Sequence, residues 1–368
     1  AKLKARARCM TDPVKLVVVG AGLVGKRHID AIAASHEAVL AAIVEPSPQV
    51  ANYAAAIGVP LFESLEDLFA QMTPDGVILA TPTPLHVSQG LTCIEHNCPV
   101  LVEKPLSTTA ADAELLTSAA TQKNVPILVG HHRRHNPLIQ EAARIVHSGE
   151  IGEVRAVQVT CWFYKPDDYF DAAPWRKQIG AGPISVNLVH DVDLIRYFCG
   201  EVVSVHAVAC PSRRGFENED VAGAILTFQN GAVGTITVSD SIVSPWSWEL
   251  TSAEYPIYPV TDRSCYLIGG SDGSLSVPDL AVWKHAETKS WWSPIAAHKA
   301  RIEASDPLLN QINHFAEVIR GTTEPLVSGQ EGLRTLQVIE AIQTSAATGK
   351  TVHLGAQGHE GAERSKVC

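Results

Sequence analysis

The feature that most constrains this chain is a glycine-rich turn between an apolar run and a helix-like segment near its start. The run Val14–Val19 has the pattern of a strand that is buried on both faces. Gly20, Gly22 and Gly25 follow it at once, with the spacing G-x-G-x-x-G. This spacing permits a tight turn, a close approach of the backbone to a pyrophosphate, and close packing of the helix expected over 23–34. The segment therefore predicts the strand, turn and helix of a dinucleotide-binding unit.

Two neighbouring features strengthen this interpretation. The helix would begin at Leu23 and Val24, where unpaired backbone N–H groups favour negative charge, so the pyrophosphate would lie there. A second apolar run, 39–44, ends in Glu45, about 20 residues beyond the last glycine, where this fold places an acid for the ribose hydroxyls. Because a carboxylate repels the 2′-phosphate of NADP, Glu45 favours NAD as the cofactor, with NADP as the alternative.

Composition limits the partners and the compartment. The chain has 368 residues, 46% of them hydrophobic, which is enough for two domains with substantial cores. Its net charge of −10 argues against nucleic acid as a partner, and no apolar run reaches the ~18 residues of a membrane span. The eight cysteines form no C-x-x-C pair, which favours reduced thiols in a cytoplasmic protein without a metal site. Residues 1–9 and 355–368 are expected to be flexible tails.

Up to about residue 130, apolar runs alternate with helix-like segments. This order predicts an α/β Rossmann domain over 10–130, with a doubly wound parallel sheet. Open sheets of this kind bind ligands at the carboxyl ends of their strands. Thr81, Pro82 and His86 follow the strand expected over 76–80, and are therefore candidates for cofactor binding.

Beyond about Gly149, strand-like runs follow one another with little helix between them. They predict an α+β domain over 131–354 with a mostly antiparallel open sheet, crossed by a helix over 184–199 and closed by helices over 307–320 and 329–347. The expected strands are 154–162, 202–210, 222–228, 232–239, 246–251 and 264–268.

The tripeptide Glu103-Lys104-Pro105 follows the strand expected over 99–102, and His190 lies on the helix expected over 184–199. Together with the glycine motif, this ordered combination over about 14–350 resembles the Gfo/Idh/MocA oxidoreductases, which include inositol dehydrogenases and glucose-fructose oxidoreductase. The resemblance implies an NAD(P)-dependent dehydrogenase of sugars or cyclitols. It also implies that Lys104 and His190 flank the reacting carbon, that Glu103 and Lys104 face the cofactor, and that the chain forms a homo-oligomer, a dimer or a tetramer.

The chemistry of the two side chains agrees with these roles. Oxidation of a secondary alcohol needs a group that takes the proton from its oxygen, and histidine titrates near neutral pH. A partly desolvated lysine can polarise the same oxygen. One departure from the family pattern is Val186, where many members carry an aspartate four residues before the histidine. The nearest polar side chain is Asn187, which can orient a substrate hydroxyl but cannot hold a charge; Asp191 or Asp193 are alternatives.

The run His131-His132-Arg133-Arg134-His135 follows the strand expected over 125–130. It is interpreted either as a solvated basic loop before a helix at Pro137, or as a pocket wall in which Arg133 and Arg134 bind an anion. Arg176 is a further candidate, and the aromatic segment that begins at Trp162 is interpreted either as a lid or subunit-contact segment or as a satellite core.

These features predict an oxidoreductase that transfers hydride between nicotinamide and a secondary alcohol of a sugar-like or cyclitol-like ring. Three alternatives remain open at this point. They are a dehydrogenase of a carboxylated cyclic cis-diol of the phthalate dihydrodiol type, an NAD-dependent glycosidase, and a non-catalytic NAD-binding sensor.

Overall fold

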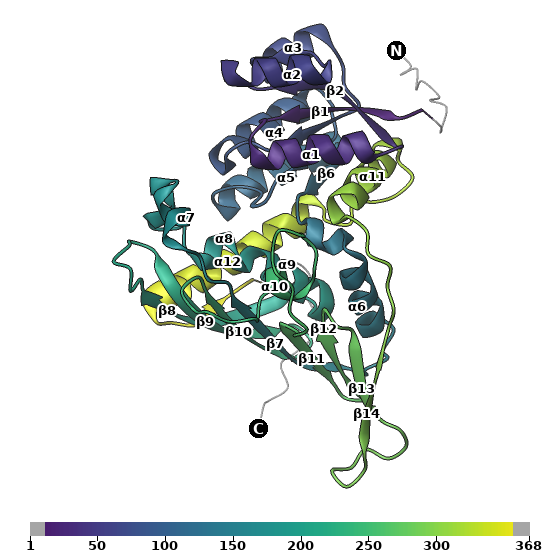
Figure 1. The fold of residues 1–368 in the computed structure, drawn as a ribbon, viewed down its shortest axis with the longest axis vertical. Coiled ribbons are helices and arrows are strands. Elements are labelled where there is room, and N and C mark those ends of the chain that lie inside the picture. The colour runs from purple at the N-terminus through teal and green to yellow at the C-terminus, as the bar shows by residue number, and fades with distance from the viewer. Residues whose placement is uncertain (1–11, 356–368) are drawn as a thin grey trace.

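The computed structural model describes residues 12–355, so the expected tails lie outside the described residues apart from Gly355. The N-terminal part is built on a parallel sheet of six strands, shown at the top of Figure 1. Its strands, from one edge to the other, are β3 (Leu61–Phe62), β2 (Ala38–Val44), β1 (Val14–Val19), β4 (Gly76–Leu79), β5 (Val100–Val102) and β6 (Ile127–Val129). The doubly wound Rossmann sheet predicted from the glycine motif is confirmed.

The central strand β1 is buried on both faces, as its β-branched sequence predicts. Val17 and Val19 belong to one apolar cluster, and Leu16 and Val18 belong to another on the opposite face. Helices cover both faces, and α1 has the bounds expected from the sequence. The helices of this part are α1 (Leu23–Ala34), α2 (Ala51–Ile57), α3 (Leu65–Gln71), α4 (His86–Glu95) and α5 (Ala110–Lys123), with short 3₁₀ turns η1 (Pro48–Val50) and η2 (Thr83–Leu85).

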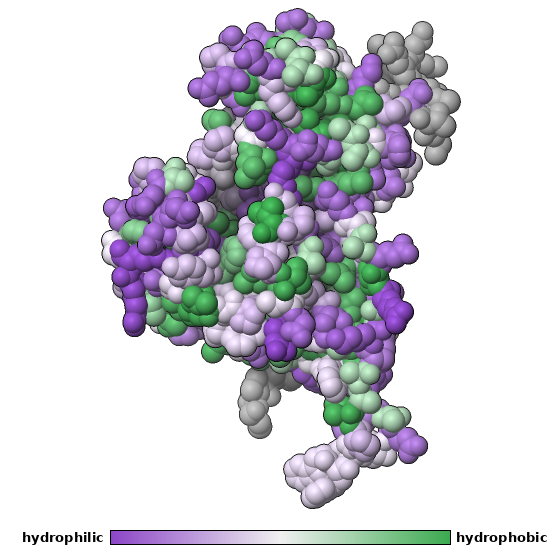
Figure 2. Space-filling model, viewed as in Figure 1, coloured by the Kyte–Doolittle hydropathy of each residue, from purple (hydrophilic) through white to green (hydrophobic). Residues whose placement is uncertain are grey.

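The second sheet has nine strands, of which only β7 and β10 pair in parallel, so the prediction of a mostly antiparallel sheet is confirmed. In spatial order its strands are β14 (Ile295–Lys299), β13 (Ala281–His285), β12 (Ser274–Val277), β11 (Tyr266–Gly270), β7 (Val154–Trp162), β10 (Val233–Ser239), β9 (Glu219–Phe228), β8 (Val202–Pro211) and β15 (Val352–His353). The β13–β14 hairpin projects from the body of the molecule, with its tip at the bottom of Figure 2.

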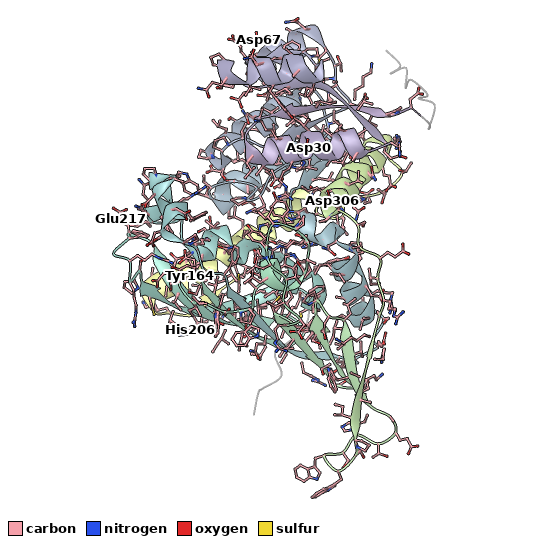
Figure 3. All side chains as sticks on the ribbon, viewed as in Figure 1. Asp30, Asp67, Tyr164, His206, Glu217 and Asp306 are labelled. Atoms are coloured by element: carbon pink, nitrogen blue, oxygen red, sulfur yellow. The ribbon has the colours of Figure 1, made fainter. Side chains whose placement is uncertain are left out.

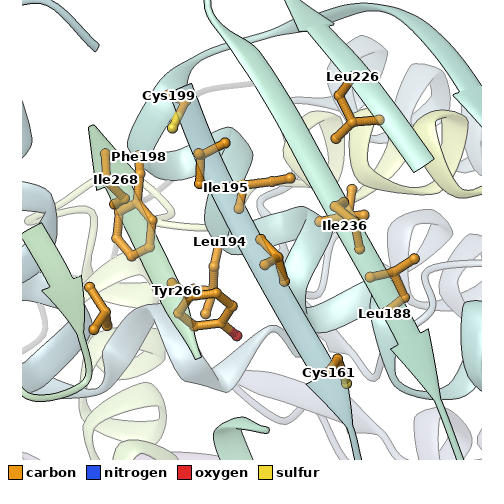
Figure 4. Packing of buried hydrophobic residues seen from close by; sticks show 14 of the residues in the cluster. Cys161, Leu188, Leu194, Ile195, Phe198, Cys199, Leu226, Ile236, Tyr266 and Ile268 are labelled. Carbon is orange, nitrogen blue, oxygen red and sulfur yellow. The ribbon is translucent and has the colours of Figure 1, made fainter. Parts of the chain in front are cut away.

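Helices cover only one face of this sheet. Leu188, Leu194 and Phe198 pack against Cys161 and Ile236 in the core drawn in Figure 4. Within residues 12–355 the opposite face carries no helix, and Figure 3 labels His206 on it. The helices of this part are α6 (Pro137–His147), α7 (Asp167–Asp171), α8 (Pro183–Val186), α9 (Leu188–Cys199), α10 (Trp248–Thr251) and α12 (Gly329–Thr348), with the 3₁₀ turns η3 (His132–His135) and η4 (Pro174–Lys177).

One late helix returns to the N-terminal sheet. The helix α11 (Pro307–Arg320) packs on α1, and its Ile312 and Phe315 are fully buried in the same cluster as Leu16. The expected division of the chain near residue 130 stays a prediction. The chain crosses between the two sheets more than once.

Three expectations for individual elements are corrected. The run 246–251 is not a strand, because the Ser247 side chain caps the amide of Leu250 and begins α10. The helix expected over 184–199 is interrupted at Asn187, which separates α8 from α9. The strand expected over 264–268 lies at Tyr266–Gly270, and β12, β13 and β14 were not predicted.

Within residues 12–355, no helix is long and apolar enough to cross a membrane. The cysteines described there are unpaired; all are buried except Cys210, which is exposed on β8. No group of three or more histidine, cysteine, aspartate or glutamate side chains in this range is placed to hold a metal ion.

Candidate active site

A cleft of about 840 Å³ lies at the carboxyl edge of the first sheet. Seven of the residues predicted to bind the cofactor line it: Gly20, Gly22, Leu23, Val24, Glu45, Thr81 and Pro82. Gly25 lies beneath the loop, where an added Cβ would come within 1.9 Å of the Gly20 carbonyl oxygen. A Cβ at Gly22 would meet nothing within 4 Å, so the backbone there faces open space. The loop thus offers bare backbone amides at the start of α1.

The Glu45 carboxylate is fixed at the floor of this cleft. Its Oε2 accepts a hydrogen bond from the Ala21 amide at 2.9 Å, and its Oε1 accepts one from the Ser47 amide at 3.1 Å. Glu63 and Glu66 line the same region. The end of β2 is therefore an acidic wall held by backbone amides.

One lining residue comes from the other half of the chain and was not predicted. Trp175, in η4, lines the cleft with its side chain half exposed. Its neighbour Arg176 stacks on Tyr169 at 4.1 Å and donates a hydrogen bond to the Tyr169 carbonyl oxygen at 2.7 Å. The aromatic residues around η4 gave the only sequence signal for this contact.

Two other residues predicted to contact the cofactor, Glu103 and His86, support the loops at this edge of the sheet, and their contact with the cofactor stays a prediction. Glu103 is buried and accepts a hydrogen bond from His28 Nε2 at 2.7 Å and one from the Lys104 amide at 3.1 Å. Burial raises the pKa of Glu103, but the bond from His28 and nearby positive charges outweigh it and hold the pKa at about 2. His86 spans two loops, 2.9 Å from the Thr81 carbonyl oxygen and 3.0 Å from that of Pro105.

Lys104 is partly buried behind this edge of the sheet. Burial lowers its pKa to about 8; Arg133 and Lys165 act in the same direction, whereas Glu103 and Glu249 oppose them. Among residues 12–355, no carboxylate lies within 4 Å of its Nζ atom. The ammonium group is therefore a cation without a fixed ion-pair partner.

His190 lies in the first turns of α9 and is close enough to Lys104 to feel its charge. Its ring makes edge-on contacts with those of His131 and His132, with centroids 6.3 Å and 5.7 Å away. Burial and then the charges of Lys104 and Arg133 hold its pKa well below the usual value, so the ring is neutral at pH 7. Its Nδ1 atom has no hydrogen-bond partner among the described residues.

The loop after β6 is not solvated, so that interpretation is wrong, although a helix does begin at Pro137. Arg133 is buried and reaches Glu249 at 2.7 Å and Asp191 at 3.5 Å. Arg134 grips both carboxylate oxygens of Asp193, at 2.7 and 2.8 Å. These bonds occupy the Arg134 guanidinium group. The prediction that Arg134 binds the substrate is therefore corrected, and its role is structural.

Behind Arg133, Asp191 is buried and accepts a hydrogen bond from Tyr266. Burial raises its pKa to about 6, against the opposing effect of Arg133. Asp191 and Asp193 therefore point into the protein, where they hold the arginines of the loop before α6. Neither replaces the aspartate that is absent at Val186.

The prediction that Trp162 contacts the substrate is also corrected. In β7 it alternates with the buried Cys161 and thus faces the open side of the second sheet, away from α9. There its Nε1 donates to Thr237 at 3.1 Å, and its ring packs on Trp246 with centroids 5.7 Å apart. Trp162 does not line the site around His190.

Asn187 stays close to His190 and has a partner that sequence reasoning missed. Its Oδ1 accepts a hydrogen bond from Lys165 Nζ at 2.6 Å, and its carbonyl oxygen accepts one from the His190 amide at 3.1 Å. Lys165 is only 6% exposed. A lysine in the sequence Tyr-Lys-Pro-Asp gives no sign that it will be buried.

A second cleft of about 620 Å³ lies between α1 and the segment before α11, where Figure 3 labels Asp30 and Asp306. Its wall includes Glu254, which is held at 3.1 Å from His132 Nε2 and at 2.7 Å from the Asn136 amide group. Glu254 thus fixes the histidine that lies against the His190 ring.

Comparisons with known proteins agree with this geometry. A family model described as an oxidoreductase family with an NAD-binding Rossmann fold matches residues 14–131, and one described as the GFO/IDH/MocA C-terminal domain matches residues 139–276. A D-apiose dehydrogenase of Paraburkholderia graminis is 26% identical over 349 residues, covering 92% of this chain and 89% of that protein.

Two further relatives are similar. The 4-carboxy-2-hydroxymuconate-6-semialdehyde dehydrogenase of a Sphingobium species is 27% identical over 237 residues, covering 61% of this chain and 72% of that protein. The crystal structure of the WlbA dehydrogenase from Bordetella pertussis, in complex with NADH and UDP-GlcNAcA, superposes with a TM-score of 0.77 at 28% identity. It covers 94% of this chain and 100% of the other.

Proposed function

The chain belongs to the GFO/IDH/MocA oxidoreductase family, and on that premise we propose that it is a dehydrogenase of a secondary alcohol on a sugar-like or cyclitol-like ring. Membership makes it an NAD(P)-dependent oxidoreductase. The observation that carries the finer proposal is the convergence of the Lys104 ammonium and a neutral, buried His190 beyond the carboxyl end of β5.

The residues of the first cleft fit a dinucleotide. The open backbone at Gly22 and the start of α1 suit a pyrophosphate, and Glu45 is fixed where a ribose would be held. When bound there, NAD supplies the hydride acceptor. With Glu63 and Glu66 beside Glu45, three carboxylates oppose an additional phosphate, so the proposal favours NAD over NADP.

The two candidate catalytic side chains have complementary protonation states at pH 7. Lys104, with a pKa of about 8, is mostly charged and can donate a hydrogen bond to the substrate oxygen. His190 is neutral and can accept the proton that leaves that oxygen as the carbonyl forms. His131 and His132 confine the ring, and His131 is itself kept neutral because burial lowers its pKa to about 4.

A sugar or cyclitol remains the first candidate substrate, in line with the D-apiose dehydrogenase among the relatives. A carboxylated cyclic cis-diol is the second candidate. Buried Lys165 favours it, and a relative is named for a carboxylated substrate.

The test is NAD reduction, followed by NADH absorbance, with a panel of cyclitols, sugars, sugar lactones and carboxylated cyclic diols. Lys104→Ala and His190→Ala are assayed beside the wild type, with NADH binding measured separately. Turnover that both variants lose while they still bind NADH supports the proposal. Glycoside cleavage without net NADH would instead indicate an NAD-dependent glycosidase, and NADH binding without either activity would indicate a sensor.

We also infer that two or more copies of the chain associate through the open face of the second sheet. Side chains on that face are apolar and largely exposed across several adjacent strands, as at Val208, Ile225, Val233 and Leu267. A flat face of this kind can pair with its own copy about a two-fold axis. Light scattering of the wild type and of Ile225→Lys tests this, since a monomeric wild type would contradict the inference.

A further inference from the structure

Lys165 is a buried cation whose side-chain contacts, with Asn187 and Tyr169, are both to uncharged groups. Its Nζ atom donates to Asn187 Oδ1 at 2.6 Å and lies 5.1 Å from the centre of the Tyr169 ring. Among residues 12–355, no carboxylate lies within 4 Å of this atom. Burying an ammonium group without an anion costs free energy, so such a group normally has an anionic partner.

The lysine is held in place by its backbone. Its amide donates to the Asp240 carbonyl oxygen at 2.9 Å, and its carbonyl oxygen accepts from Arg214 at 2.9 Å. The nearby Asp240 carboxylate accepts from the same arginine at 3.0 Å. The nearest fixed anion therefore has its own partner, and Lys165 is set in position before any ligand arrives.

A second unpaired cation lies in the same region. Lys165 is among the positive groups that lower the pKa of Lys104, which also lacks an ion pair. The third cation, Arg133, is balanced by Glu249 at 2.7 Å. The two lysines therefore place two ammonium groups without fixed ion-pair partners in the region of His190.

The geometry suits a planar anion with two oxygens. Lys165 Nζ has three donors and uses one on Asn187. The Asn187 amide nitrogen has no hydrogen-bond partner among the described residues and is adjacent to the ammonium group. Asn187 lies about one helical turn before His190 and accepts a hydrogen bond from its amide, so an anion here would lie in the same region as the candidate catalytic histidine.

We propose that Lys165 and the Asn187 amide bind a carboxylate of the substrate, so that the enzyme acts on the hydroxyl of a carboxylated ring such as a uronate or a cyclic diol acid. This assignment rests on the proposed dehydrogenase function and names its substrate class. Lys165 is then a specificity-determining residue, and Asn187 takes the place of the aspartate absent at Val186.

The experiment uses matched pairs of compounds: glucuronate with glucose, galacturonate with galactose, and a carboxylated cyclohexadiene cis-diol with its carboxamide. NAD reduction is measured for each member. Binding of each member to the enzyme–NADH complex is measured by calorimetry, which requires no turnover. The variants are Lys165→Met, which keeps the length of the side chain, and Asn187→Asp, which gives Lys165 a fixed anion and thus competes with the ligand. Lys177→Met is the control, because Lys177 pairs with Asp171 at the surface of the same segment.

The wild type is expected to prefer the acid of at least one pair. In Lys165→Met, the ratio of kcat/KM for the acid to that for its neutral partner should fall by ~100-fold, mostly through KM, because a charged hydrogen-bonded contact is lost. Asn187→Asp should lower the same ratio, and Lys177→Met should leave it unchanged.

Two results separate this proposal from the general function. Turnover that prefers the neutral member of every pair, or equal losses for acid and neutral partner in Lys165→Met, would overturn the carboxylate site and leave the dehydrogenase function standing. Acid binding that depends on Lys165 without any NAD reduction would support the site and contradict the dehydrogenase function. If no acid binds the NADH complex, the proposal is wrong.

Discussion

The two walls of the active site are made from different parts of the chain. The proposed cofactor wall consists mainly of backbone, at the turn Gly20–Gly25 and the start of α1, together with the Glu45 carboxylate, which two backbone amides hold. The proposed substrate wall consists of side chains from four separate segments, with Lys104, His132, Lys165 and His190 as its members. Backbone geometry depends on local spacing, whereas the second wall depends on tertiary packing. Substitutions in the two walls should therefore have different effects, on NADH binding in the first and on turnover in the second.

The largest expected effect is on the cofactor wall. Gly25→Ala should abolish measurable NADH binding and lower the melting temperature, because its Cβ would lie 1.9 Å from the Gly20 carbonyl oxygen. Gly22→Ala should keep the fold, since its Cβ meets nothing, and weaken NADH binding alone. Fluorescence titration with NADH and thermal unfolding measure both, with Gly269→Ala in β11 as the control. Normal NADH binding by Gly25→Ala would contradict this account of the loop.

On the substrate wall, Lys104→Met should lower kcat by ~10³-fold while NADH binding stays within a few fold, because general acid–base and polarising groups contribute on this order. Steady-state kinetics and NADH titration give the two numbers. Lys123→Met, on the surface of α5, is the matched control. A kcat that is unchanged in Lys104→Met would remove Lys104 from the reaction.

Glu103 connects the two walls, and its loss should appear as lost stability. Because the folded pKa, about 2, lies below the usual 4.5, the carboxylate stabilises the fold above pH ~4.5, and this contribution is lost as the pH falls through about 2. Glu103→Gln should therefore lower the free energy of unfolding at pH 7 by about 2 kcal/mol, and by less at pH 3. Denaturant unfolding at both pH values checks this, with the exposed Glu95→Gln as the control. An equal loss at both pH values would show that charge is not the cause.

The pH profile distinguishes the roles of the two catalytic candidates. His190 stays neutral across pH 6–8, so the rate of alcohol oxidation should be flat there. Above pH 8 the ammonium of Lys104 is lost, and kcat/KM should fall by about tenfold per pH unit. Initial rates at saturating NAD from pH 6 to 10 measure this. A rate that rises through pH 8 would make neutral Lys104 the base instead.

The smallest effect concerns cofactor choice. Glu45→Gln should raise the preference for NADP relative to NAD by on the order of tenfold, because it removes one of the carboxylates that repel a 2′-phosphate. The single oxygen of the Gln side chain can still accept from the Ala21 backbone, whereas the bond from the Ser47 amide is lost. Kinetics with both cofactors give the ratio, and an unchanged ratio would exclude Glu45 as the selective group.

The contrast between local backbone geometry and tertiary packing also explains which features could be predicted from the sequence. The first sheet, the bounds of α1 and the residues that line the cofactor cleft follow from glycine spacing and apolar runs, which act over short distances. Lys165 and Trp175 could not be found in this way, because each is placed by contacts with distant segments. The alternating pattern at 246–251 predicts a strand, but the serine cap at its start and the burial of Trp248 make it a helix.

Arg133 and Arg134 show the limit for charged groups. A basic run after a strand predicts either solvent or an anionic ligand, and here carboxylates of the protein itself pair with both arginines. Those carboxylates lie more than 50 positions away in the chain, in α9, α10 and α12. No pattern within the run itself indicates them.

Because α11 returns to the first sheet, the two halves of the molecule should unfold together. A fragment that ends near residue 130 would leave the surface of α1 and β1 without Ile312 and Phe315, and thus exposed to water. Limited proteolysis should release no stable N-terminal fragment, and denaturation should follow a single transition. The chain passes between the sheets before α6 and again on both sides of α11. These three connections should limit how far the two walls can move apart. Cofactor exchange is then expected to proceed through local movement of the segment around Trp175 rather than through opening of the whole molecule.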